Sequence, residues 1–186
     1  LGDYVKRMKD AQKAIYYQVA PSRSTIETGP YVEAFKSKGY EVLYLYDNID
    51  EYVVSSLREF EGKPLQAVNS NEVDLGDVAN EGDALSEADT TTLCDWLKTT
   101  LAEGVEEVRS GKRLVNSPAL AITPDGEMTP QMRQMMKAMK PEEVEAPKVI
   151  LEINPRHEIV KKLAALSQSD ADSAKVIAEQ ILDNAL

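Results

Sequence analysis

"YEVLYLYDNIDEYVVSSLREFEGKPLQAVN", residues 40–69, places two short apolar runs on either side of a segment with a helical pattern. The first run, residues 40–47, is rich in Tyr, Val and Leu, and the second, residues 63–69, carries Leu and Val; both are typical of buried strands. Residues 49–60 lie between them, and Asp50, near the start of this segment, is a plausible N-cap for a helix. The stretch therefore predicts a strand, a helix and a second strand.

The residues before this stretch repeat the same order. "KAIYYQVA", residues 13–20, predicts another buried strand. Residues 24–39, "STIETGPYVEAFKSKG", have a helical pattern that stops at Gly39. Alternating strands and helices form a small α/β unit, and we expect the three strands to pair in parallel.

An acidic segment follows the α/β unit. Residues 71–89 contain seven acidic residues, no basic ones and little periodicity. Such a composition is typical of a solvated linker. It divides the chain into residues 1–70 and residues 90–186.

The second part predicts a mixed α+β unit. Residues 91–104 form a helix with apolar residues on one face, and residues 105–115 and 119–123 form an antiparallel pair around a turn at "NSP". Residues 148–154 add a third strand. Two helices close the chain: the first begins at Asn154, with Pro155 in its first position, and the second spans residues 170–186.

A methionine-rich helix is predicted between these strands. Residues 128–139, "MTPQMRQMMKAM", hold five of the six methionines. Thr129 is a plausible N-cap, and Met132, Met135, Met136 and Met139 fall on one helical face. The spacing favours a core face, whereas the composition favours a flexible surface that accommodates unlike partners.

The last helix also has two interpretations. Its apolar stripe consists of residues that recur at helical spacing: Ala174, Ile177, Ala178, Ile181, Leu182 and Ala185. The stripe can pack on the core of its own domain. It can also form, with the preceding helix, the seam of a homodimer, because two short helices bury more apolar area against a symmetric copy.

Composition excludes several classes of partner. The formal net charge of −11 would repel phosphate backbones and anionic lipid, so we expect neither nucleic acid nor membrane as a partner. No apolar run approaches the roughly 18 residues of a membrane span. The start, "LGDYVKRMKD", lacks the apolar stretch of a signal peptide and an initiator Met, so we expect a fragment of something longer whose targeting segment would not be visible here. The single cysteine fits a reducing compartment, and we expect a protein that is not secreted.

Residues that could carry catalysis are few. His157 is the single histidine, and we expect it to be structural or exposed. Cys94 is the single cysteine and lies beside apolar helix positions, which indicates a small buried side chain. "EGKP", residues 61–64, lacks the glycine spacing of a phosphate loop. We expect no metal site and no catalysis.

Five segments together resemble the end of the middle domain and the C-terminal domain of the heat-shock protein 90 chaperone family. They are "DYVKRMKDAQKAIYY" from residue 3, "GYEVLYLYDNIDEYVVSSLREFEGKPL" from residue 39, "NSPALAI" from residue 116, "MTPQMRQMMKAM" and "LEINPRHEIVKKL" from residue 151. The resemblance implies an α/β part of the middle domain at 1–70, an acidic linker at 71–89 and a dimerisation domain at 90–186. It also implies that the two closing helices form a four-helix bundle across a homodimer.

The resemblance further implies which residues bind partners. The dimer seam would contain Ile159, Leu163, Ile177, Ile181 and Leu182. Unfolded or partly folded client proteins would contact Glu51, Tyr52, Met128, Met132, Met135 and Met136.

The expected function is therefore that of a dimerisation and client-binding fragment of an ATP-dependent chaperone. The family's ATPase lies in an N-terminal domain, so ATP and Mg²⁺ would belong to the full-length protein and this chain would hold no cofactor. The absence of a Met-Glu-Glu-Val-Asp tail indicates a bacterial or mitochondrial-type member, in the bacterial cytoplasm or the mitochondrial matrix. The alternative is a small α/β ligand-binding or enzyme domain fused to a helical oligomerisation unit, with its site near residues 46–51.

Overall fold

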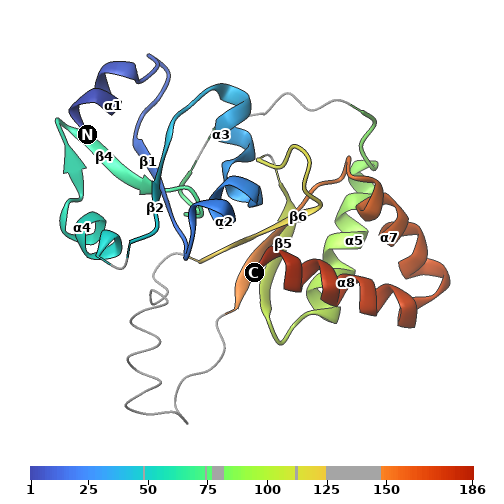
Figure 1. Cartoon of the computed structure of the whole chain (residues 1–186). Coiled ribbons are helices and arrows are strands. Elements are labelled where there is room, and N and C mark those ends of the chain that lie inside the picture. Colours follow the sequence, from blue (N-terminus) through green and yellow to red (C-terminus); the bar gives the residue numbers. More distant parts are fainter. Residues whose placement is uncertain (48, 74, 77–81, 112, 125–147) are drawn as a thin grey trace, which may run out of the picture.

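The computed structural model describes residues 1–47, 49–73, 75–76, 82–111, 113–124 and 148–186. These residues form a mixed α/β structure with two sheets (Figure 1). In chain order the elements are α1 (Gly2–Arg7), β1 (Ile15–Val19), α2 (Arg23–Thr28), η1 (Pro30–Val32), α3 (Glu33–Lys38), β2 (Val42–Leu45), α4 (Asp50–Ser56), β3 (Glu59–Phe60), β4 (Lys63–Ala67), α5 (Glu87–Thr100), β5 (Val105–Ser110), β6 (Ala119–Ile122), β7 (Val149–Ile153), α7 (Glu158–Ser169) and α8 (Ala171–Ala185).

The first sheet has the strand order β2-β1-β4-β3. β1 pairs in parallel with β2 on one side, where Tyr16 lies opposite Val42, and with β4 on the other, where Tyr16 lies opposite Gln66. This confirms the predicted parallel unit. On its α3 side, Tyr16 packs edge-on against Phe35, with ring centroids 4.7 Å apart.

The predicted helix at 49–60 is too long, because its last residues form the unpredicted strand β3. This strand pairs antiparallel with β4. Glu61 and Gly62 connect the two strands, both with positive φ (50° and 72°). A two-residue loop with this backbone is the hairpin turn that matches strand twist. The "EG" pair is thus a turn signal.

The segment between β1 and β2 is helical but interrupted. Gly29 has φ −72° and ψ 153°, the extended backbone that a following proline favours, so α2 ends there and η1 begins at Pro30. α3 then ends at Gly39, whose φ of 64° lies in the left-handed region. The stop predicted at Gly39 is confirmed.

The second sheet has the order β5-β7-β6. β7 pairs in parallel with β5 and antiparallel with β6. The predicted antiparallel pair of residues 105–115 with 119–123 is therefore wrong, because β7 lies between them. All five residues of β7 are buried, whereas β5 has exposed positions, so the most apolar strand occupies the centre.

The two faces of the second sheet meet different partners. Helices α5, α7 and α8 cover one face (Figure 1), and Ala119 and Ala121 of β6 join their core. The alternate residues Leu120 and Ile122 point to the opposite face, where they pack with Tyr31 of η1. This second face joins the two sheets.

Two of the predicted helix caps are wrong. Asp50 is the first residue of α4, and its carboxylate accepts a hydrogen bond from the backbone N–H of Asp47 instead. α7 begins at Glu158, where the Nδ1 atom of His157 accepts from the N–H of Ile159 at 3.1 Å. Asn154 does not cap the helix: it is buried and its amide donates to the carbonyl of Ser117. His157 thus has a structural role, as predicted.

The acidic segment is not a solvated linker throughout. Val73 and Leu75 are buried in the core of the first sheet. At the other end, the N–H of Leu85 donates to the carbonyl of Pro155, and Ser86 caps α5. Its two described ends therefore pack against the fold, and the domain boundaries remain predictions.

Candidate functional site

Exposed apolar side chains gather around the start of α4. Tyr46, Ile49, Tyr52 and Val53 are 46%, 67%, 70% and 50% exposed. All seven residues of α4 are described, and none of them is buried. Large apolar side chains grouped on a surface mark binding sites more often than chance. We call these four residues the α4 surface.

The α4 surface follows directly from local structure. Ile49, Tyr52 and Val53 are spaced at 0, +3 and +4, so they share one face of the helix. Of the four, only Tyr52 is a predicted client contact, and Tyr46 and Ile49 fall in the stretch where the alternative function would place its site. The available signal was this spacing, but the same spacing is typical of a buried face, so the sequence does not reveal that the face is exposed.

Glu51 and Tyr52, the two predicted client contacts in this region, have different surroundings. Tyr52 is the most exposed member of the α4 surface. Glu51 is half-buried, and its charge contributes to the raised pKa of Tyr17 on β1, whose main cause is burial. The helix therefore places Tyr52 toward solvent and Glu51 near the first sheet. Met128, Met132, Met135 and Met136 lie outside the described residues.

The predicted dimer residues divide into two groups. Leu163, Ile181 and Leu182 are 2%, 6% and 9% exposed and belong to the core between α5, α7, α8 and the second sheet. Ile159 and Ile177 are 46% and 37% exposed. Of the two interpretations of the last stripe, packing on the core of its own domain therefore describes Ile181 and Leu182.

The exposed side of the two closing helices carries further apolar residues. Val176 of α8 is 65% exposed and lies next to Ile177 in the sequence. The small residues Ala174 and Ala178, both 0% exposed, allow α8 to approach α7 and the second sheet closely. The helix thus packs inward through its alanines and presents Val176 and Ile177 outward.

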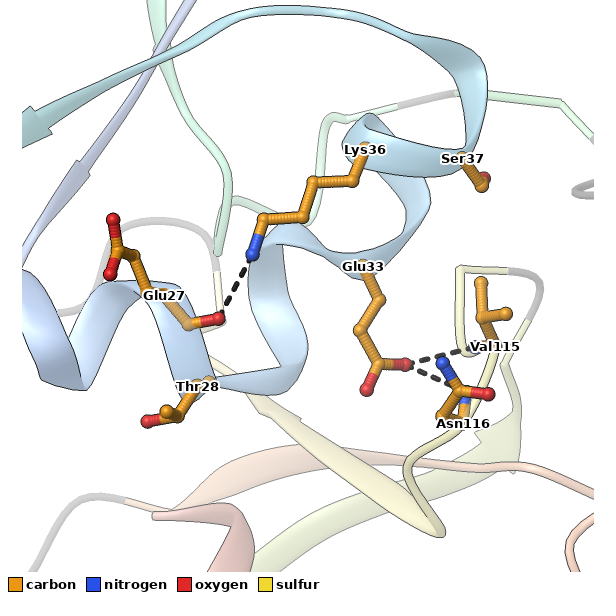
Figure 2. Close-up of a pocket in the computed structure, with 8 residues that line it drawn as sticks. Glu27, Thr28, Glu33, Lys36, Ser37, Val115 and Asn116 are labelled. Atoms are coloured by element: carbon orange, nitrogen blue, oxygen red, sulfur yellow. Dashed lines mark hydrogen bonds between the residues drawn. The ribbon is translucent and has the colours of Figure 1, made fainter.

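A cavity of about 480 Å³ lies between α2, α3 and the loop at 115–116 (Figure 2). Two of the charged side chains that line it, Lys36 and Glu33, form hydrogen bonds with the backbone of the protein. The ammonium of Lys36 donates to the backbone carbonyl of Glu27 at 2.9 Å. The carboxylate of Glu33 accepts from the N–H groups of Val115 and Asn116. This cavity is away from residues 46–51, where the alternative function would place a ligand.

A buried ionic network joins the two sheets. Glu152 of β7 is 5% exposed, and its Oε1 atom lies 2.8 Å from Arg109 and 3.3 Å from Arg113. The Arg113 guanidinium also donates to the carbonyls of Val68 and Ser70, which follow β4. Strand β7 is thereby tied to the end of the first sheet.

Tyr31 makes a second joint between the two parts of the structure. Its hydroxyl donates to the carbonyl of Ala121 on β6 at 2.7 Å and reaches that of Ala185 on α8 at 3.3 Å. Burial raises the pKa of Tyr31 to about 12, so the hydroxyl remains a donor at physiological pH. The C-terminal end of α8 is therefore anchored to η1.

The described residues offer little for catalysis. Cys94 is buried, as predicted, and burial raises the pKa of its thiol to about 11, so the reactive thiolate is scarce at neutral pH. No three potential metal ligands come together in the described ranges. Among the helices of the described residues, none has the length and apolar character to cross a membrane.

Comparison with known proteins shows the family of this chain. A family model described as Hsp90 protein matches residues 1–186. The chain belongs to the Hsp90 family. Three similar relatives each bear the name Chaperone protein HtpG: one of Desulfitobacterium hafniense is 44% identical over the whole chain, one of Frankia casuarinae is 45% identical over 94% of it, and one of Desulfotalea psychrophila is 39% identical over the whole chain.

The Hsp90 match confirms the resemblance found in the sequence. The chain covers 30%, 27% and 31% of the length of these three relatives. It therefore corresponds to a segment of an Hsp90-type chaperone, and the alternative of a separate small α/β enzyme is not favoured. All three relatives are bacterial proteins.

Proposed function

We propose that this chain is the client-binding and dimerisation part of an ATP-dependent Hsp90-type chaperone. The observation that carries the proposal is the exposure of the α4 surface in a chain of a chaperone family. An unfolded protein exposes apolar segments, and covering them stabilises the complex by about 25 cal/mol per Å² of apolar surface. The α4 surface can bury such a segment while the chain stays folded, because its side chains are already exposed.

The proposed client site combines the α4 surface with the methionine-rich helix expected at 128–139. Tyr52 supplies a large, rigid aromatic side chain, and Met128, Met132, Met135 and Met136 supply flexible ones that adapt to unlike sequences. Glu51 lies beside the surface as an acidic group. Sequence alone supports the methionine part of the proposal.

A double substitution tests the α4 surface. Ile49→Gln with Val53→Gln removes two exposed apolar side chains, and water can hydrate the new amides. We expect a melting temperature within a few degrees of the original and a severalfold loss in suppression of aggregation of a thermally unfolding test protein, followed by light scattering.

Ser56→Gln is the matched control, because it introduces the same residue at an exposed position of the same helix without removing apolar surface. It should leave the protection intact. Full protection by the double variant at unchanged stability would show that clients bind elsewhere.

The proposed dimer uses the outward side of α7 and α8. Ile159, Val176 and Ile177 are exposed, whereas the neighbouring Leu163, Ile181 and Leu182 hold the two helices on the core of their own chain. Two copies related by a twofold axis would bring identical patches together as a four-helix bundle. In this arrangement the buried group fixes the position of the two helices on their own chain, and the exposed group contacts the second copy.

Sedimentation equilibrium of an Ile159→Gln and Ile177→Gln variant tests this seam. We expect the dimer dissociation constant to rise at least about tenfold, because two central apolar contacts are lost. Thr91→Gln on the exposed side of α5 is the control and should leave the dimer unchanged. A wild-type chain that stays monomeric at micromolar concentration would contradict the proposal.

The remaining assignments follow from the family. We propose that residues 1–70, 71–89 and 90–186 are the end of the middle domain, an acidic connection and the dimerisation domain. The ATPase, with ATP and Mg²⁺, would belong to a preceding N-terminal domain. The bacterial relatives support a place in the bacterial cytoplasm over the mitochondrial matrix, and the net charge of −11 supports client proteins over nucleic acid or lipid as partners.

A further inference from the structure

The α4 surface lies within a stretch of the chain whose charges are almost all negative. Residues 46–61 contain five acidic residues and one basic residue, Arg58. The acidic residues are Asp47, Asp50, Glu51, Glu59 and Glu61. Within the described residues, none of these five carboxylates forms an ion pair with Lys or Arg. Among the residues that the structure describes, no ion pair therefore neutralises their negative charge.

Along the chain, these carboxylates lie before, among and after the apolar residues of the α4 surface. Asp47 lies between Tyr46 and Ile49 in the sequence and is exposed. Glu59 and Glu61 are also exposed, in the β3–β4 hairpin that begins three residues after the end of α4 (Figure 1). Charges within about 8–10 Å of one another act together at physiological ionic strength. An apolar segment on α4 would thus have carboxylates at its margins.

The exposed tyrosine rings favour the same kind of partner. Tyr46 and Tyr52 are among the most exposed aromatic residues that the structure describes. The face of a tyrosine ring attracts Lys and Arg side chains. Arg23 already lies 5.8 Å from the ring centroid of the nearby Tyr44, which shows this contact within the fold. Tyr46 and Tyr52 of the α4 surface therefore also favour a partner that carries Lys or Arg.

We propose that the α4 surface selects client segments in which an apolar core is flanked by lysine or arginine. The inference rests on the proposed function and names the class of client. The apolar core covers Ile49, Tyr52 and Val53, and the flanking cations lie against the carboxylates and tyrosine rings. A segment flanked by Asp or Glu meets like charges at the same margins, and this repulsion adds to the discrimination.

Three fluorescent peptides with one apolar core and different flanks test the proposal. The flanks are two lysines, two serines or two glutamates at each end, and binding to the 186-residue chain is followed by anisotropy. We expect the lysine peptide to bind about tenfold more tightly than the glutamate peptide at low salt, with the serine peptide between them. The ratio should fall to about threefold or less in 0.5 M salt, because exposed charges are screened.

Two charge-neutralising variants separate the local effect from the total charge of the chain. Asp47→Asn with Glu51→Gln should reduce the lysine-to-glutamate ratio about threefold. Glu106→Gln with Glu107→Gln changes the net charge equally at exposed positions of β5 in the other sheet. This control should leave the ratio unchanged.

The outcomes distinguish the inference from the proposed function. Equal binding of all three peptides, reduced by Ile49→Gln with Val53→Gln, would overturn the charge preference and keep the client site. Equal effects of the two charge variants would also overturn it, since overall attraction would then explain the ratio. Binding that the Ile49 and Val53 substitutions do not change would overturn the client site itself.

Discussion

Replacing Glu152 by alanine is expected to lower the free energy of unfolding by about 3–5 kcal/mol. Glu152 is 5% exposed and accepts hydrogen bonds from Arg109 and Arg113. Arg113 is itself 6% exposed. Without the carboxylate, its guanidinium would remain buried with no neutralising charge, and this desolvation causes the loss.

Urea unfolding followed by circular dichroism measures this effect. Glu107→Ala on the adjacent strand β5 is the control, because Glu107 is exposed and its loss should cost no more than about 0.5 kcal/mol. Glu152→Gln should fall between the two, since the amide keeps one oxygen that can accept from the arginines. A loss below about 1 kcal/mol for Glu152→Ala would mean that water reaches Arg113.

Loss of Glu152 should also affect residues outside β7, because Arg113 forms hydrogen bonds with both the second sheet and the end of the first. Its guanidinium donates to the carbonyls of Val68 and Ser70 as well as to Glu152. Loss of Glu152 should therefore loosen the contact between the end of β4 and the second sheet. Faster amide hydrogen exchange at residues 65–70 would report it.

Leu163→Ala is expected to lower the free energy of unfolding by about 2–5 kcal/mol, although the family resemblance places Leu163 in the same dimer seam as Ile159. Leu163 is 2% exposed and packs in the core of α5, α7 and α8, so its removal leaves a cavity. Ile159, one turn earlier on α7, is 46% exposed, and Ile159→Ala should cost less than about 1 kcal/mol.

The two variants should also differ in their dependence on protein concentration. The loss in Leu163→Ala belongs to the single chain, so it should persist at concentrations where the dimer has dissociated. The effect of Ile159→Ala should appear as weaker association. If Leu163→Ala lowered the free energy of unfolding only slightly, and this loss vanished on dilution, Leu163 would have to be assigned to the dimer contact instead.

Local sequence determined most of the secondary structure. The strands β1, β2, β4 and β7 fall inside the predicted apolar runs, and α5 and α8 fall where apolar residues recur at helical spacing. Gly39 ends α3 as predicted, because only a residue without a side chain adopts its positive φ at little cost. The parallel pairing of β1 with β2 and β4 also follows from the alternation of these strands with helices.

Competing local signals account for several errors. Pro30 divides the first predicted helix. The turn at Glu61 and Gly62 causes the last residues of the second predicted helix to form a strand of a hairpin. Both signals are visible in the sequence. His157 rather than Asn154 caps α7, because Asn154 is held by the loop at 115–117, a contact between distant parts of the chain.

Tertiary structure alone decided which apolar faces are open. Ile49, Tyr52 and Val53 have the spacing of a core face but lie on the surface, whereas Leu163, Ile181 and Leu182 have the same kind of spacing and are buried. It also placed β7 between β5 and β6 and brought Glu152 to Arg109 and Arg113, 43 and 39 residues away. Helix and strand preferences arise among residues a few positions apart, so the sequence determines them. Burial and strand order depend on segments far apart in the chain that meet only when the whole structure packs.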